Sequence, residues 1–389
     1  MSKKRGFFMF DIKDCRRQSK TLVPDDGFHY FFGYYDLQPY SDDGKKHLCH
    51  RVSFWDRLPT AEDVAELGFV DTATGQFHKV TETTAWNFQQ GAMLRWYDSQ
   101  SIIYNIRENN TFKCAITDIS TGATRTLPLP LATVSPESGF GLSVNFSRIF
   151  DFRPGYGYAG IPDPFSEKAP GNDGVFRVDL KSGEVLKLLD YKQLVELFPD
   201  KPFTDCRLIV NHITFNTDGT RFIFLLRNFP EGDMPWLTML IACDLEGNLT
   251  KLSNFCFMSH YAWKDERYLL IESDHASDGK RELHVFDTVN GSTGLIVVPR
   301  VNDTGIHCLY SPDRQYILGD GYPDLEKYRP LYLYNIEKKE LETIAQVYSN
   351  PTENWDNRCD LHVRWRPDGK KISFDTNHNG RREIYEMNI

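Results

Sequence analysis

Four histidines occupy the same position in four successive copies of a sequence repeat. Each lies three residues before the aromatic residue of a turn motif, and the four are His212, His260, His307 and His362. The chain has 11 histidines in 389 residues, so this coincidence is improbable by chance. Imidazole binds divalent metals and transfers protons near neutral pH. The pattern therefore predicts that these side chains meet at a metal site, a proton-transfer site or both.

A structural alternative is that the histidines cap the starts of strands and were copied with the repeat. The first three repeats have Leu37, Met93 and Ser143 at the equivalent position. Copying would have placed histidine there as well, so the restriction to the last four repeats favours a functional site.

The repeat that carries the histidines predicts the fold. Its anchor residues are spaced by 56, 50, 69, 48, 47 and 55 residues, and they are Tyr40, Trp96, Phe146, Phe215, Trp263, Tyr310 and Trp365. Short apolar runs and tight turns ending in glycine follow most anchors, as in a series of β-hairpins. A repeat of this length matches one four-stranded blade of a β-propeller. We therefore expect an all-β fold, with one seven-bladed propeller domain over residues 1–389.

The long third repeat predicts an insertion near residues 150–172 and a helix at 191–198. Two β-sandwiches or two smaller propellers are the alternatives, but the even spacing of the turns and the lack of a linker argue against both. In a propeller the inner strands line a central channel, so residues at one register face each other around the axis. This arrangement would bring the four histidines to one mouth of the channel.

The ends of the second strands return to the same face of the ring, and their residues are polar. They are His50, Arg51, Asn105, Arg107, Arg227, Asp274, His275, Asp320, Asp375, Asn377 and His378. Such side chains could orient the imidazoles or bind substrate. The alternative for each of them is ordinary turn chemistry.

Two further segments contain residues that suit substrate binding. The candidates are Asn87 and Gln90 in the first segment, then Asn145, Arg148, Arg153, Tyr156 and Tyr158 in the second, with Arg207 just ahead of His212. Arginine binds carboxylates through two parallel hydrogen bonds, and aromatic faces stack on sugar rings. The alternative for the second segment is a packed insertion with surface arginines.

The composition limits the partners and the compartment. With 45 Lys and Arg against 54 Asp and Glu, the net charge of −9 does not predict nucleic-acid or anionic-membrane binding. Eight scattered cysteines without a CxxC pair fit reduced thiols. No membrane span or signal peptide is evident, so we expect a cytoplasmic protein, or a periplasmic one if a leader has been removed. The oligomeric state is left open.

The turn motifs Ser311-Pro-Asp313 and Arg366-Pro-Asp-Gly369 resemble those of TolB-like propellers. Together with histidines at the channel mouth, the chain resembles the oligogalacturonate lyase family and, more loosely, the propeller-fold ulvan lyases. The likeness is most specific around His212, His260 and residues 360–369.

The first resemblance implies a divalent metal, manganese in that family, with zinc and calcium as other candidates. His260 and His362 would be metal ligands, His212 the base and Arg207 the assisting arginine. The family has a Gln-x-x-His-x-His cluster in its last blade, whereas residues 359–364 of this chain read Cys-Asp-Leu-His-Val-Arg. His307 or Asp360 would complete the metal site, or arginines alone would neutralise the substrate carboxylate.

The resemblance to ulvan lyases implies proton transfer by histidine and tyrosine beside an arginine, which directs attention to Tyr156, Tyr158 and Arg153. We therefore expect a lyase that cleaves an acidic, uronate-containing oligosaccharide by β-elimination. A glycoside hydrolase using a pair among Asp274, Asp320 and Asp375 is one alternative. A non-catalytic propeller that binds a glycan or protein is the other.

Overall fold

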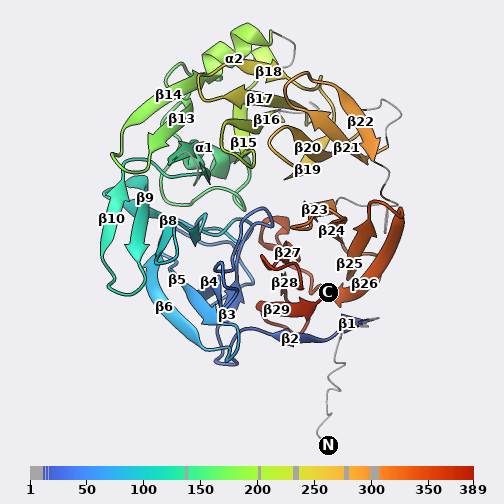
Figure 1. Cartoon of the computed structure of the whole chain (residues 1–389). Helices are drawn as coiled ribbons and strands as arrows, with labels where there is room; N and C mark the ends of the chain where they lie inside the picture. The colour runs from blue at the N-terminus through green and yellow to red at the C-terminus, as the bar shows by residue number, and fades with distance from the viewer. Residues whose placement is uncertain are drawn as a thin grey trace, which may run out of the picture.

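The structure is a computed structural model that describes residues 12–13, 15, 17–135, 139–199, 203–230, 236–275, 280–296, 298 and 306–389. These residues form seven antiparallel sheets arranged in a ring around a common axis (Figure 1). Six sheets have four strands and one has five. The expected all-β, seven-bladed propeller with four-stranded blades is confirmed.

The first four blades are built from consecutive strands, which follow one another from the axis outward. Blade one is β3 (His29–Phe31), β4 (Lys46–Val52), β5 (Ala65–Asp71) and β6 (Phe77–Thr83). Blade two is β7 (Arg95–Trp96), β8 (Ser101–Glu108), β9 (Thr111–Asp118) and β10 (Thr124–Leu127). Blade three is β11 (Thr133–Ser135), β12 (Phe140–Ser143), β13 (Gly174–Asp179) and β14 (Val185–Asp190). Blade four is β15 (Leu208–Phe215), β16 (Arg221–Asn228), β17 (Thr238–Asp244) and β18 (Leu249–Lys251).

The last three blades carry the other three predicted histidine positions. Blade five is β19 (Met258–Trp263), β20 (Tyr268–Ser273), β21 (Glu282–Asp287) and β22 (Thr293–Ile296). Blade six is β23 (Ile306–Tyr310), β24 (Tyr316–Gly321), β25 (Tyr328–Asn335), β26 (Glu340–Tyr348) and β1 (Ile12–Lys13). Blade seven is β27 (Arg364–Trp365), β28 (Lys371–Thr376), β29 (Glu383–Asn388) and β2 (Ser19–Thr21).

The ring is closed by strands from the start of the chain. β2 pairs with β29 as the outer strand of blade seven, and β1 pairs with β26 of blade six. Just after β2, the Leu22 amide donates to the Ile384 carbonyl at 2.8 Å, and the Leu22 side chain is buried. These pairings of N-terminal with C-terminal strands cover strand edges that could otherwise pair with another protein chain.

The outer hairpin turns follow the chemistry expected from their sequences. In the turn after β5, the Asp71 carboxylate accepts hydrogen bonds from the amides of Ala73 and Thr74. Gly75 then adopts a φ of 74°, which a residue without a Cβ adopts at least cost.

The register predicted for the third repeat is wrong. Its inner strand is β11, so Ser143 ends the second strand and Phe146 begins a helix. The Asn145 side chain accepts from the Arg148 amide and caps this helix, α1 (Phe146–Phe152). The Phe146 ring stacks on Tyr158 at 4.4 Å instead of anchoring a hairpin.

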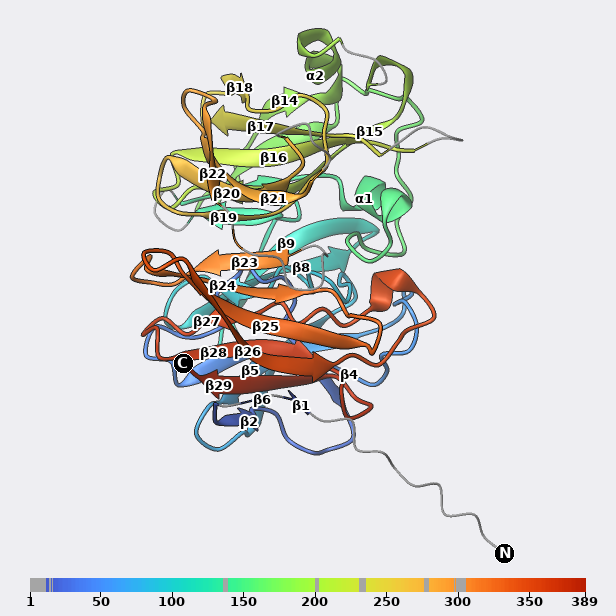
Figure 2. The same ribbon diagram turned by 90° about the vertical axis from the view of Figure 1, so that its right-hand side faces the viewer.

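The predicted insertion lies between β12 and β13 and includes α1. The helix predicted at 191–198 is α2 (Tyr191–Leu197), which starts with a capping box between Asp190 and Gln193. Two short 3-10 helices, η1 (Phe203–Asp205) and η2 (Trp355–Asn357), complete the elements of the described chain. Figure 2 shows α1 on one face of the ring, which is the far face in Figure 1.

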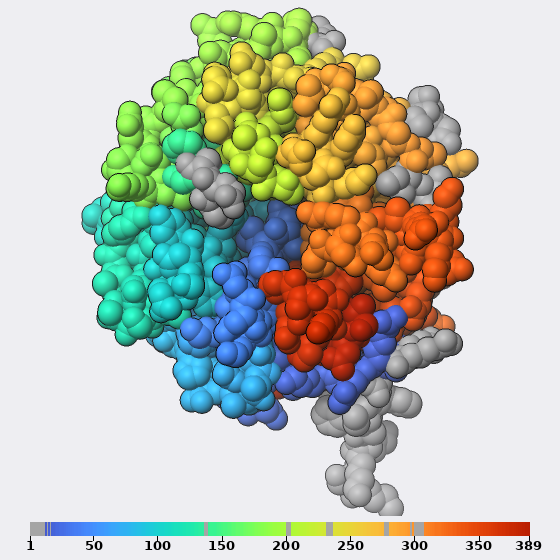
Figure 3. Space-filling view, in the orientation of Figure 1, coloured from blue at the N-terminus to red at the C-terminus, as the bar shows by residue number. Residues whose placement is uncertain are grey.

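The early part of the chain also reaches the middle of the ring. Figure 3 shows dark blue, N-terminal chain at the centre of the face that it presents. A separate observation concerns membranes: no helix among the described residues has the length and apolar character needed to cross a bilayer. The eight cysteines are free thiols.

We predict that Leu22→Ala lowers the free energy of unfolding by about 2–5 kcal/mol, because it opens a cavity where the ring closes. The control is Leu325→Ala, since Leu325 is fully exposed and its loss should change stability by less than about 0.5 kcal/mol. Urea unfolding of the three proteins measures both values. Equal stability of all three would contradict the role given to this closure.

Candidate active site

A short segment of the first blade crosses the centre of the ring and lies among the four histidines. The Tyr34 ring stacks on His212 at 5.3 Å and meets His362 edge-on at 5.0 Å. The Tyr35 ring lies 5.2 Å from His307. The other three histidines contact one another. The ring centres of His260 and His307 are 4.1 Å apart, and those of His307 and His362 are 4.6 Å apart.

The carboxylate of Asp375 holds this central segment in place. It accepts from the amides of Phe32 and Gly33 and pairs with the Arg364 guanidinium at 3.1 Å. All of these groups are buried. At Gly33, with a φ of 129°, a Cβ would lie 2.9 Å from the Gln90 backbone, so the close crossing requires glycine.

Irregular backbone directs the histidines toward the axis. The ladder between β15 and β16 shifts register at His212, and the ladder between β19 and β20 shifts at His260. His212 and His362 have positive φ values of 50° and 43°. A bulge changes the direction of a side chain, and strained backbone lowers stability. Both features are therefore common at functional sites. At the bulge in β19, the Tyr35 hydroxyl accepts a hydrogen bond from the Tyr261 amide and donates one to the Tyr261 carbonyl. It thereby supplies partners for the backbone groups that the ladder leaves unpaired there.

The three clustered histidines share one hydrogen-bonding arrangement. In each ring Nδ1 donates to an oxygen, which leaves Nε2 with its lone pair. The acceptors are Glu272 Oε2 for His260 (3.2 Å), Asp320 Oδ1 for His307 (2.9 Å) and the Gly33 carbonyl for His362 (2.8 Å). Burial lowers the pKa of His260 to about 4 and holds the pKa of His362 well below its ordinary value, so both rings are neutral at pH 7.

These residues fit a divalent metal. The Nε2 atoms of His307 and His362 are buried without a hydrogen-bond partner, and a ligand atom from each lies within 4.8 Å of the other and of an Asp360 oxygen. Nδ1 held by a carboxylate or carbonyl is the usual support of a metal-binding histidine. Imidazole with one carboxylate suits manganese or zinc, whereas calcium prefers oxygen ligands throughout.

Asp360 is charged and held by two arginines. Arg358 and Arg329 pair with its carboxylate at 2.6 and 2.9 Å. Burial alone would raise the pKa of Asp360, but the two guanidinium groups hold it well below its ordinary value. A negative ligand is therefore present beside His307 and His362.

A cavity of about 560 Å³ opens beside the histidine cluster, and Arg153 at the end of α1 is among the residues that line it. His260 and Tyr322 line it, and three arginines do so as well, namely Arg153, Arg227 and Arg281. Arg227 is 3% exposed and donates to the Met258 carbonyl at 2.9 Å, and no carboxylate of the described chain pairs with it. Burial lowers its pKa to about 10. A buried cation without a counter-ion is unfavourable unless an anion joins it.

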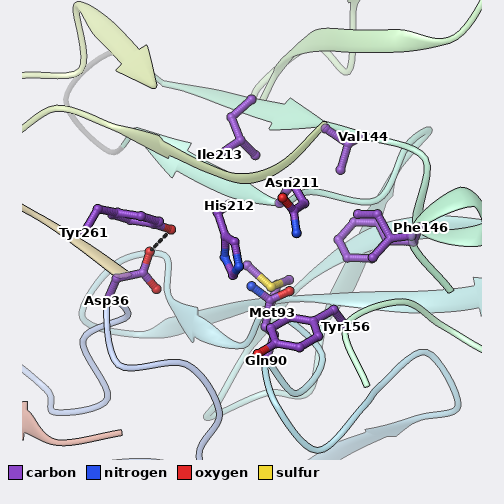
Figure 4. Close-up of a pocket in the computed structure, with 12 residues that line it drawn as sticks. Asp36, Gln90, Met93, Val144, Phe146, Tyr156, Asn211, His212, Ile213 and Tyr261 are labelled. Atoms are coloured by element: carbon purple, nitrogen blue, oxygen red, sulfur yellow. Dashed lines mark hydrogen bonds between the residues drawn. The ribbon is translucent and has the colours of Figure 1, made fainter. Parts of the chain in front are cut away.

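His212 faces a small enclosed pocket next to this cavity (Figure 4). Figure 4 shows it among Gln90, Tyr156, Asn211 and Tyr261, and Tyr156 also stacks under Arg153. The Nδ1 atom of His212 is buried without a hydrogen-bond partner. Burial, with Arg227 as the next cause, holds the pKa of His212 well below its ordinary value.

Three of the predicted polar residues lie elsewhere, in a network around Asp163. Arg207 pairs with Asp163 at 2.8 Å, so it is not beside His212. Arg148 is fully buried, pairs with the same carboxylate at 3.0 Å and donates to two backbone carbonyls. Asn145 caps α1 and donates to Asp163 as well. Arg148 and Arg207 thus attach the insertion to blade four, whereas Arg207 was expected to be the assisting catalytic arginine and Arg148 and Asn145 to bind substrate.

Two more predicted residues make their contacts within the protein, away from the histidines. Tyr158 is fully buried, stacks on Phe146 and accepts from the Asn105 amide at 2.9 Å, away from the histidines. Asn87 bonds the backbone of Gln90 and Gly157. Of the proposed substrate contacts, Gln90, Arg153 and Tyr156 are the ones that lie at the pocket or the cavity.

The aspartates considered for hydrolysis are not assembled as an acid–base pair. Asp320 holds His307 and the His362 amide, and Asp375 holds the central segment. Asp274 does line the cavity, where its carboxylate accepts from the Phe257 amide at 2.7 Å.

Comparison with known proteins gives similarity at the level of fold. No family model matches the chain, and no curated protein sequence matches it. A solved structure described as oligogalacturonate lyase in complex with manganese has a TM-score of 0.70 at 17% identity, covering 98% of this chain and 96% of that chain. An oligogalacturonate lyase from Vibrio parahaemolyticus has a TM-score of 0.69 at 14% identity, with the same coverage. The β-propeller domain of the trilobed protease from Pyrococcus furiosus has a TM-score of 0.56 at 10% identity and 93% coverage of both chains. The expected likeness in fold to oligogalacturonate lyases is confirmed.

The two buried arginines should respond oppositely to removal of their charge. Arg227→Met removes a buried cation that pairs with no carboxylate of the described residues, so we predict a higher Tm than that of the wild type. Arg148→Met removes one of the two arginines that neutralise the buried Asp163 carboxylate, so it should lower the free energy of unfolding by about 3–5 kcal/mol. Thermal and urea unfolding measure the two effects, and destabilisation by both variants to the same degree would contradict this assignment.

Proposed function

We propose that this protein is a lyase that cleaves uronate-containing oligosaccharides by β-elimination. The observation that supports this most directly is Arg227, a buried cation that pairs with no carboxylate among the described residues and that lines a cavity together with His260. An anionic substrate would supply the missing charge. The likeness in fold to proteins named oligogalacturonate lyases agrees with this proposal.

The chemistry starts at C5 of the uronate, next to the carboxylate. Its proton is too weakly acidic for an imidazole until the charge that develops on the carboxylate is stabilised. Arg227 and Arg153 bind this carboxylate in the proposed complex. His212 takes the proton, the bond between C4 and the glycosidic oxygen breaks, and a double bond forms between C4 and C5. The leaving oxygen accepts a proton from water and departs as a hydroxyl, and His212 then releases its proton to solvent.

Substrate binding also strengthens the base. Arg227 and Arg153 both contribute to the low pKa of His212 in the free protein. A carboxylate bound to these guanidinium groups offsets their charge, so the pKa of His212 rises toward its ordinary value. A neutral imidazole therefore becomes a better proton acceptor when the substrate is bound.

The metal site has a supporting part in the proposal. His307, His362 and Asp360 would hold a divalent ion, with His260 beside them. When bound, that ion supplies additional positive charge for the uronate carboxylate.

A direct assay separates this proposal from its alternatives. Incubation with uronate oligosaccharides should give an unsaturated product that absorbs in the ultraviolet, and Arg227→Met should lower kcat/KM by about 100-fold or more, since it removes charge stabilisation. Arg125→Met, at an exposed position on β10, is the matched control and should retain activity. New reducing ends without the absorbance would indicate a hydrolase, and binding without either product would indicate a non-catalytic propeller.

Metal content provides a test that does not depend on activity. We predict one manganese or zinc ion per chain after loading and desalting, and its loss in His362→Ala and in Asp360→Asn, because each removes a ligand. His78→Ala changes an exposed histidine on β6 and should keep the metal. If the wild-type protein retains no metal, the predicted metal site is wrong, and the arginines alone would neutralise the substrate carboxylate.

A further inference from the structure

We propose that Trp236 and Trp355 are stacking platforms for two different sugar rings, so that the cavity selects an oligosaccharide over a single uronic acid. This inference rests on the proposed function, because it takes the cavity to bind an acidic sugar. Both tryptophans line the cavity, and they approach it from different parts of the ring. Trp236 precedes β17 in blade four, and Trp355 begins η2 between blades six and seven.

Trp236 is exposed but rigidly supported. Its side chain is 44% exposed, although it packs edge-on against Phe152 at 5.2 Å. The guanidinium groups of Arg227 and Arg153 lie 5.1 and 5.6 Å from its ring centre. Contacts between arginine and indole are favourable and fix the orientation of the ring. Exposed aromatic surface at the rim of a cavity is typical of a binding site.

Trp355, which also lines the cavity, is likewise exposed and held by an aromatic ring and an arginine. It is 56% exposed, its ring lies 5.7 Å from that of Tyr322, and the Arg358 guanidinium is 4.7 Å from its centre. The Arg358 side chain also donates to the Trp355 carbonyl at 3.1 Å. The indole is therefore held at the cavity and keeps a large apolar area open to a ligand.

An ion pair connects the two platforms. Arg153, which lies over Trp236, pairs with Asp356, the residue after Trp355, at 3.2 Å. The ion pair links the two segments that carry the indoles, and the tryptophans belong to different parts of the ring. In the proposed complex each indole contacts a sugar ring of its own. The cavity volume is within the range of about 300–1,000 Å³ that is typical of ligand pockets.

The chemistry of the cavity favours an acidic sugar as the occupant. A pyranose presents an apolar C–H face to an indole and hydroxyls to polar neighbours. The arginines supply charge for its carboxylates, and Arg281, stacked on Phe257 at 3.7 Å, adds a cation on the wall formed by blade five.

Calorimetry with the His212→Asn variant tests this proposal without turnover. We expect Trp236→Ala and Trp355→Ala, made in that background, each to weaken binding of a uronate trisaccharide by about tenfold. A monosaccharide can occupy one platform at a time, so its affinity should change by more than twofold in at most one of the two variants. The Trp→Phe variants should retain most of the affinity, since a flat apolar ring remains. The control is Tyr268→Ala, an exposed aromatic outside the cavity that also has cationic neighbours.

The outcomes separate this inference from the proposed function. Unchanged trisaccharide affinity in both alanine variants, or equal losses for monosaccharide and trisaccharide in both of them, would overturn the platforms even if the wild type forms unsaturated product. A selective loss for the trisaccharide would support them, and it would do so even if the wild type released no such product. Thermal unfolding of each variant excludes loss of fold as the cause of weak binding.

Discussion

The site depends on one buried carboxylate, that of Asp375, which holds a strand-like segment across the middle of the ring. Through Phe32 and Gly33 it positions the carbonyl that orients His362 and the two tyrosines that pack between the histidines. Because these contacts are desolvated, they are strong when complete and costly when broken. The imidazole cluster is therefore a property of the whole ring, with contributions from its first and last blades.

Charge is distributed unevenly between the surface and the cavity. The chain carries a net charge of −9, yet its cavity gathers three arginines with Asp274 as the acidic lining residue. Such a separation concentrates positive potential where a small anion would bind and leaves the exterior acidic. Arg227, which pairs with no carboxylate of the described residues, is a cost to stability that a bound anion would offset.

Much of the fold and the histidine set could be predicted because both are repetitive. Turn residues and anchor spacing determine blades locally, and an equal register places His212 to His362 around the axis. The errors arose where the chain departs from repetition. Phe146 resembled an anchor but starts a helix, and Arg148 and Arg207 looked like free cations because their partner, Asp163, lies in an insertion whose path has no periodic signal. Tyr34 and Trp355 were missed because their contacts join distant parts of the chain.

The closure by β1 and β2 has a consequence for biosynthesis. Their partners, β26 and β29, are more than 300 residues later in the chain, so both N-terminal strands must wait unpaired until the ribosome has made the final blades. Pairing over such sequence separations is slow and exposes strand edges in the meantime. Newly made chains are therefore most vulnerable to aggregation and to chaperone capture just before β26 and β29 have been made.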